Sequence, residues 1–158
     1  MRSSFKVAVM IELLAVACAL FVAHAAQAQM RSFSPGTFTI DRFPVDCGTN
    51  VTVLNPQLRD AGMNDLQGHV YLNPTIVRGL PTSVKFFIYA HECGHSVVGA
   101  NESAADCWAI QTGKQEGWFT PQNFSALMQF FASNPEGWTH APDRARLRRM
   151  AACFAAAR

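Results

Sequence analysis

Residues 86–110 read FFIYAHECGHSVVGANESAADCWAI, and this stretch decides how the rest of the chain is interpreted. It opens with an apolar run, which predicts a buried helix. His91 and His95 are four residues apart, so on a helix both imidazoles lie on one face, one turn apart. Burying two histidines and Glu92 without partners would be costly. The stretch therefore predicts a metal site on a buried helix.

The H-E-x-x-H spacing gives each polar residue its own role. Neutral imidazoles of His91 and His95 can fill two tetrahedral positions on one Zn²⁺ ion. Glu92 does not bind the metal in this arrangement, but accepts a proton from metal-bound water and so makes the nucleophile. Zinc is the favoured metal, although other divalent ions accept such ligands. The alternative is an amphipathic helix with solvent-facing histidines, which the apolar flank disfavours.

Glu102 is the best candidate for a third protein ligand, which catalytic zinc sites usually have. Gly99 predicts the end of the helix and allows the chain to turn back toward the metal. Asp106 lies one helical turn beyond Glu102, on the same face. We expect Asp106 to hydrogen-bond the far ring nitrogen of His91 or His95. Asp106 is also the fallback ligand if Glu102 does not reach the metal.

The flanking segments predict an α+β fold. β-rich runs at residues 37–40, 51–54 and 69–72 predict a small N-terminal sheet of two or three strands. Residues 55–68 are rich in turn formers, and we expect at most one short helical turn there. Capping and stop residues predict about four helices in the second half. Their expected starts are Thr82 or Ser83, Asn101, Thr120 and a point near Pro142.

The first 28 residues are typical of a secretory signal peptide. A basic start, MRSSFK, precedes an apolar run, and Ala26-Gln27-Ala28 is a suitable cleavage site. We expect an exported protein, periplasmic or secreted, and the rival is a retained N-terminal anchor. Glu12 lies inside the apolar run and argues against a stable membrane span.

Cleavage after Ala28 would leave a flexible leader, residues 29–36, and a single domain, residues 37–158. The formal net charge of +2 is too small to indicate nucleic-acid binding, and no basic cluster is interleaved with aromatic residues. Composition therefore favours a small exported enzyme or binding domain.

The motif pair HECGH and ESAAD resembles gluzincin metallopeptidases, in particular small exported relatives of the CAAX-prenyl-protease and heat-shock-protease type. The resemblance implies a zincin-like fold and a zinc-dependent peptidase. It implies that His91, His95 and Glu102 bind one zinc ion, with Glu92 as the general base and Asp106 as the partner of a ligand histidine. Many members of that family insert a longer loop before the third ligand.

A second stretch, WTHAPDRARLRRM, is similar to the T-H-P-x-x-x-x-R-[IL] pattern near the C-terminus of that family. It implies that His140 or Arg146 stabilises the oxyanion of the tetrahedral intermediate. The alternatives are that His140 caps the last helix and that Arg146 makes a structural ion pair. The stretch HVYLNP, residues 69–74, is a candidate edge strand for pairing with an extended substrate.

Four cysteines follow the signal peptide, an even number that suggests two disulfides in an exported chain. Three connectivities are possible. Our working hypothesis pairs Cys47 with Cys93 and Cys107 with Cys153, because each bridge would then rigidify one metal-bearing helix. The alternative leaves Cys93 and Cys107 as free buried thiols.

The sequence thus predicts zinc-dependent hydrolysis of peptide or protein substrates. A zinc-binding interaction or chaperone-like module that does not cleave is the second hypothesis. A disulfide-stabilised domain without metal is the third.

Overall fold

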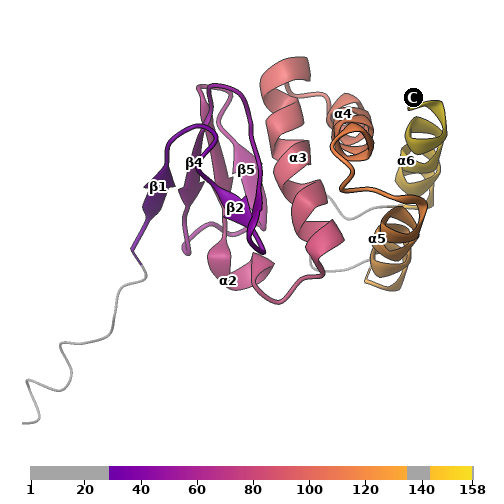
Figure 1. Cartoon of the computed structure of the whole chain (residues 1–158), viewed down its shortest axis with the longest axis horizontal. Coiled ribbons are helices and arrows are strands. Elements are labelled where there is room, and N and C mark those ends of the chain that lie inside the picture. Colours follow the sequence, from indigo (N-terminus) through magenta and orange to yellow (C-terminus); the bar gives the residue numbers. More distant parts are fainter. Residues whose placement is uncertain (1–28, 135–142, 158) are drawn as a thin grey trace, which may run out of the picture.

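The structure is a computed structural model that describes residues 29–134 and 143–157. Its fold is α+β, with a small sheet on one side, helix α3 in the middle and three further helices on the other side (Figure 1). The helices are α2 (Pro74–Val77), α3 (Thr82–Val98), α4 (Glu102–Gln115), α5 (Pro121–Ser133) and α6 (Arg144–Ala156). Among the described helices, none is long and apolar enough to cross a membrane.

The main sheet has four strands in the order β1-β4-β6-β5. Strands β4 and β6 are parallel, while the outer strands pair antiparallel with them. Their bounds are β1 (Arg31–Phe33), β4 (Val51–Leu54), β5 (Gly62–Asn64) and β6 (His69–Leu72). Strand β5 is therefore an edge strand, and it lies beside α3.

A separate hairpin of β2 (Thr39–Ile40) and β3 (Phe43–Pro44) docks on the start of α3. The carboxylate of Asp41, in the turn of this hairpin, accepts hydrogen bonds from Thr82 Oγ1 at 2.6 Å and Lys85 Nζ at 2.8 Å. The sequence placed the N-cap of this helix at Thr82 or Ser83. Pro81 occupies that position instead, without a side-chain cap, and Asp41 satisfies the hydroxyl of Thr82 from outside the helix.

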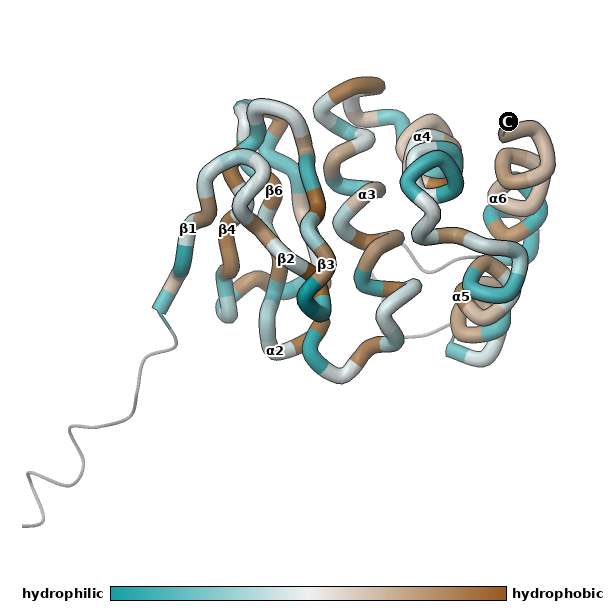
Figure 2. Tube along the Cα trace, in the orientation of Figure 1, coloured by the Kyte–Doolittle hydropathy of each residue, from teal (hydrophilic) through white to brown (hydrophobic). Residues whose placement is uncertain are grey.

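Helix α3 forms the centre of the core, and eleven of its twelve residues from Val84 through His95 are buried, Lys85 being the exception. Hydrophobic residues gather in β4, β6 and α3, the inner elements of the fold (Figure 2). Its end at Gly99, with a φ of +72°, and the capping of α4 by Asn101 agree with the sequence predictions. The N-cap at Thr120 also agrees.

The sheet differs from the prediction in three places. Part of the expected flexible leader, Arg31–Phe33, forms strand β1. The turn-rich residues 55–68 contain the edge strand β5. Strand β6, expected at an edge, is paired on both sides by β4 and β5. The common reason is that these short strands form by tertiary pairing, which local composition does not encode.

Candidate metal centre

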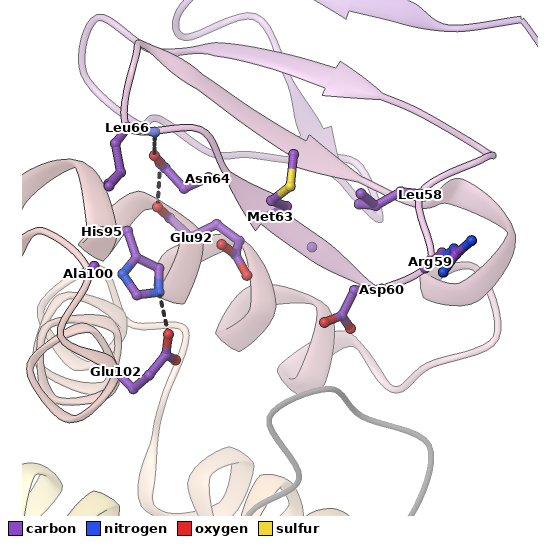
Figure 3. A pocket seen from close by; sticks show the side chains of 11 residues that line it. Leu58, Arg59, Asp60, Met63, Asn64, Leu66, Glu92, His95, Ala100 and Glu102 are labelled. Atoms are coloured by element: carbon purple, nitrogen blue, oxygen red, sulfur yellow. Dashed lines mark hydrogen bonds and ion pairs between the residues drawn. The ribbon is translucent and has the colours of Figure 1, made fainter.

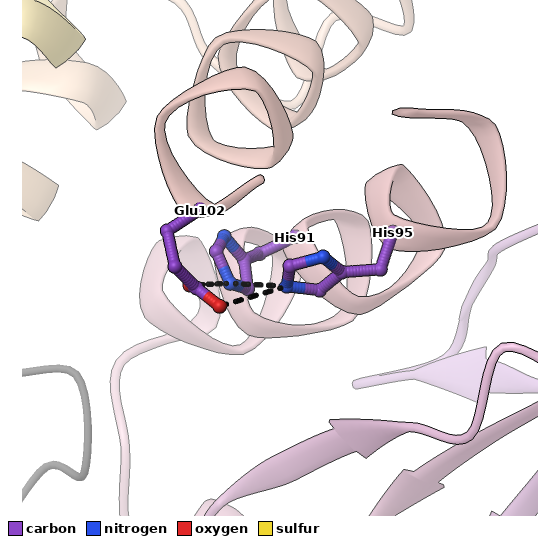
Figure 4. Close-up of side chains that lie close together, drawn as sticks. All are labelled: His91, His95 and Glu102. Carbon is purple, nitrogen blue, oxygen red and sulfur yellow. Dashed lines mark hydrogen bonds and ion pairs between the residues drawn. The ribbon is translucent and has the colours of Figure 1, made fainter. Parts of the chain in front are cut away.

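His91 and His95 lie on the buried part of α3, with 4% and 8% of their surface exposed. Their spacing of four residues turns both rings to the same side of the helix, as Figure 4 shows. The two Nε2 atoms are 3.2 Å apart. Two nitrogen donors therefore converge on one point, as the H-E-x-x-H spacing predicted.

Glu102, the first residue of α4, supplies an oxygen donor to the same point. Its Oε2 lies 3.2 Å from His91 Nε2, and its Oε1 lies 3.5 Å from His95 Nε2. The chain reaches this position because α3 ends at Gly99 and α4 starts only three residues later. Glu102 thus takes the place that the sequence predicted for a third ligand.

The distances among these donors fit a metal ion. Ligand atoms about 2.1 Å from a tetrahedral zinc ion are roughly 3.4 Å from one another. The two Nε2 atoms are 3.2 Å apart, and the Glu102 carboxylate approaches His91 Nε2 with Oε2 at 3.2 Å and His95 Nε2 with Oε1 at 3.5 Å. His91, His95 and Glu102 could therefore hold a metal ion with little rearrangement, and two nitrogens with one carboxylate are donors that zinc accepts.

The other nitrogen of each ring faces a partner within the protein. His91 Nδ1 lies 2.9 Å from Asp106 Oδ1, and His95 Nδ1 donates to the carbonyl oxygen of Gly99 at 2.8 Å. Such contacts place the ring proton on Nδ1 and leave Nε2 as the lone-pair donor. The sequence left open which histidine Asp106 would serve, and the structure assigns it to His91.

Asp106 is 1% exposed and is held by Arg146 through two hydrogen bonds of 2.7 Å, from Nε to Oδ2 and from Nη2 to Oδ1. Burial alone would raise the pKa of Asp106, but hydrogen bonds from His91 and Arg146 outweigh it and hold the pKa below its usual value. Of the two roles considered for Arg146, the structural ion pair matches this geometry. Its guanidinium faces Asp106, behind the ligand histidines.

Glu92 points from α3 toward the sheet and is 8% exposed. Burial, together with the negative charges of Asp60 and Glu102, raises the pKa of Glu92 to about 8. Its side chain packs under Gly62 of β5, where a Cβ atom would come within 2.9 Å of Glu92 Cγ. A glycine at this position therefore leaves room for the carboxylate beside the edge strand.

A cleft of about 410 Å³ opens over these groups, between β5, the C-terminal end of α3 and the N-terminal end of α4 (Figure 3). Glu92, His95 and Glu102 line its floor, and residues 58–64 line its wall. A smaller polar hollow of about 370 Å³ adjoins it and shares His95 and Leu66 with it. His95 and Glu102 are therefore accessible from one side, whereas His91 is buried and does not line the cleft.

The edge of β5 faces this cleft. Just before β5, the carbonyl oxygen of Ala61 accepts a hydrogen bond from the N–H of Asn73, the residue that follows β6. Just after β5, the N–H of Asp65 donates to the carbonyl oxygen of His69 in β6. Because the direction alternates along an antiparallel strand, the N–H and C=O groups of Gly62 and Asn64 point away from β6. An extended chain in the cleft would meet these backbone groups.

Both disulfides of the working hypothesis are present. Cys47–Cys93 ties the loop before β4 to α3, next to Glu92, and Cys107–Cys153 ties α4 to α6. The second bridge joins the helix of Glu102 to the helix of Arg146. Each of the two helices that carry candidate ligands is thus fixed covalently to a neighbouring element.

Some predicted residues lie elsewhere. His140 and the proposed signal peptide fall outside the described residues. The sequence analysis missed Asp60, Gly62 and Asn64, which belong to the wall of the cleft. These residues lie in a run of turn-forming residues, and nothing in that run indicated a strand.

No protein-family model matches the chain, and neither a curated protein nor a solved structure matches it significantly.

Proposed function

We propose that the protein is an exported zinc-dependent metallopeptidase with a zincin-like fold. One observation carries the proposal: His91 Nε2, His95 Nε2 and Glu102 converge at tetrahedral spacing, with Glu92 beside them in an accessible cleft. A metal centre that only stabilises a fold is usually closed by four protein ligands. Here two of the three candidate ligands, His95 and Glu102, line the floor of an open cleft, which favours a catalytic centre.

Each residue of the site has a part in the proposed hydrolysis. A bound zinc ion would supply Lewis acidity, which polarises a carbonyl group and lowers the pKa of a water molecule. The Glu92 carboxylate takes a proton from the attacking water and passes it to the nitrogen of the leaving amine. A positive charge nearby lowers the pKa of a carboxyl group, so we expect Glu92 to be ionised at neutral pH in the metal-loaded protein.

The surrounding elements orient the ligands and the substrate. Asp106 and the Gly99 carbonyl fix the ring orientation of His91 and His95. The outward backbone groups of Gly62 and Asn64 can pair with an extended peptide and hold its carbonyl over the cleft floor. Strand β5 takes the role that the sequence analysis gave to residues 69–74.

Export is supported by the two disulfides, which persist in oxidising compartments. The signal-like sequence of residues 1–28 points the same way. The substrate is accordingly proposed to be a peptide or protein outside the cytoplasm.

The test is zinc content by elemental mass spectrometry on the purified chain, run beside cleavage of a peptide mixture. We expect about one zinc per chain in the wild type and in Glu92→Gln, and loss of zinc in His95→Ala. Cleavage should be lost in both Glu92→Gln and His95→Ala. His69→Ala is the matched control, since His69 lies on β6 and pairs with Asp65 away from the cleft floor, and it should keep both zinc and activity.

Three results would contradict the proposal in different ways. No zinc in the wild type, even after zinc is offered, would favour a purely structural domain. Zinc without cleavage would favour the interaction module. Normal cleavage by Glu92→Gln would show that the assigned mechanism is wrong.

A further inference from the structure

The two ends of the cleft differ in chemistry. Asp60 lies at one end, beyond Glu92, and Leu66 lies at the other end, next to His95 (Figure 3). The carboxylate of Glu92 lies between them. A peptide that follows β5 across the cleft floor would therefore pass an acidic group on one side of the reacting bond and an apolar group on the other.

Asp60 is a carboxylate that forms no ion pair within residues 29–134 and 143–157. Its Oδ1 accepts a hydrogen bond from the backbone N–H of Ala61 at 2.7 Å, which fixes its orientation. Among the residues that the structure describes, no cationic side chain forms an ion pair with it, although Arg59 is adjacent in sequence. A dication would be balanced by Glu92 and Glu102, so Asp60 would remain as an acidic group that no described ion pair neutralises, although the Arg59 side chain also lines the cleft.

Leu66 is held in an unusual position. It has a φ of +57°, which is rare for a branched apolar residue, and 55% of its surface is exposed. Its backbone N–H donates to Asn64 Oδ1 at 2.7 Å, while Asn64 Nδ2 donates to the carbonyl oxygen of Glu92 at 2.7 Å. The Asn64 side chain therefore links the backbone of Leu66 to that of helix α3. An exposed leucine fixed at a cleft mouth provides an apolar contact.

We propose that the cleft selects peptides with a lysine or arginine side chain at the Asp60 end and an apolar side chain at the Leu66 end, on opposite sides of the scissile bond. This inference rests on the proposed peptidase function, and it names the substrate class of the same site. Complementary charge favours encounter as well as binding, and the basic-residue preference should weaken as salt is raised.

The test uses the zinc-loaded chain and internally quenched peptides that differ only in one residue, Arg, Gln, Glu or Leu, at each position in turn. The wild type should prefer Arg over Gln by about fivefold in kcat/KM at one position, the scale of a partly exposed ion pair. Asp60→Asn, which keeps an oxygen for the Ala61 N–H, should abolish that preference. Asp60→Lys should reverse it in favour of Glu.

Two further variants complete the set. Glu116→Gln removes an exposed carboxylate at the end of α4, outside the cleft, and should leave the preference unchanged. Leu66→Gly accommodates the positive φ but removes the side chain, so it should reduce selection for an apolar residue without altering the preference for Arg.

Binding to zinc-loaded Glu92→Gln, measured by fluorescence anisotropy with the same peptides, separates this inference from the proposed function. Charge-dependent binding without cleavage by the wild type would support the inference and contradict the peptidase proposal. Cleavage with no dependence on charge, or a dependence that survives Asp60→Asn, would overturn the inference alone. Neither binding nor cleavage would overturn both.

Discussion

Two buried carboxylates lie on opposite sides of the candidate metal ligands, and their surroundings affect them in opposite ways. Behind the ligands, Asp106 is paired with His91 and Arg146, and its pKa is lowered. In front, Glu92 lies under β5 near other negative charges, and its pKa is raised to about 8. Burial opposes ionisation of both groups, so their partners decide the outcome.

The contrast separates a structural role from a chemical one. A carboxylate kept ionised by an arginine is a fixed support, because it does not exchange protons near neutral pH. A carboxylate with a raised pKa is a group that can accept and release a proton, as a general base must. The three predictions below test the rear side first, then the front side, and last the turn that connects the two ligand-bearing helices.

Asp106→Asn should have the largest effect. It removes the negative charge that accepts two hydrogen bonds from the buried Arg146 guanidinium, and breaking such a buried pair costs about 3–5 kcal/mol of unfolding free energy. It also removes the support of His91, which should weaken zinc binding by about 10–100-fold. Urea unfolding and competition with a zinc chelator measure the two effects. Asp143→Asn keeps the cap of α6 and is the control that should stay close to the wild type.

A loss of stability in Asp106→Asn without any change in zinc affinity would mean that the rear pair supports only the fold. Unchanged stability would mean that Arg146 finds another partner, and the assigned contrast between the two carboxylates would be wrong.

Glu92→Gln should act in the opposite direction in the metal-free protein. A folded pKa above the unfolded value means that Glu92 contributes stability below about pH 4.5, and that this contribution is lost as pH rises through about 8. The loss across that range is roughly 4 kcal/mol. Glu92→Gln should remove this pH dependence and stabilise the apoprotein at pH 8, as thermal unfolding between pH 5 and 9 would show.

Asp106, the carboxylate paired with Arg146, should show the opposite pH dependence of stability. Because the pKa of Asp106 is lowered, its contribution is present at neutral pH and is lost as pH falls below its ordinary range. If the metal-free wild type became more stable from pH 5 to 8, the assignment of a raised pKa to Glu92 would not hold.

Gly99→Ala should have the smallest effect on stability. A Cβ atom there meets nothing within 4 Å, so its cost of about 1 kcal/mol comes from the φ of +72° alone. The same change should weaken zinc binding, since Gly99 also holds His95 Nδ1 and precedes Glu102. Gly79→Ala, where φ is negative and space is open, is the control. Equal zinc affinities in the two variants would show that the turn does not set the ligand geometry.

The sequence predicted Glu92 and the candidate ligands better than it predicted the contacts of Asp106 behind them. His91, Glu92, His95 and Glu102 were predictable because a helical repeat and a glycine stop bring neighbours in sequence together. The pairing of Asp106 with His91 was left open, since either histidine was within reach of the same helix face. The ion pair with Arg146 spans forty residues, and the sequence offered it only as an alternative.

The residues of the cleft wall could not be predicted from the sequence. Gly62 and Asn64 belong to a three-residue strand that exists because β6 pairs with it, and residues 55–68 look like turns by composition. Residues 69–74 were expected to form an edge strand because nothing in the sequence indicated a further strand beyond them. The helices and the candidate ligands were therefore predictable from local patterns, whereas the edge strand beside the cleft depended on long-range pairing.

The most direct test of the central claim is a crystal structure of the zinc-loaded protein with anomalous diffraction measured on both sides of the zinc absorption edge. The account predicts one strong peak per chain within about 2.1 Å of His91 Nε2, His95 Nε2 and a carboxylate oxygen of Glu102. A peak at another site, such as Asp65 and His69, or no peak at a zinc concentration that saturates binding, would contradict it.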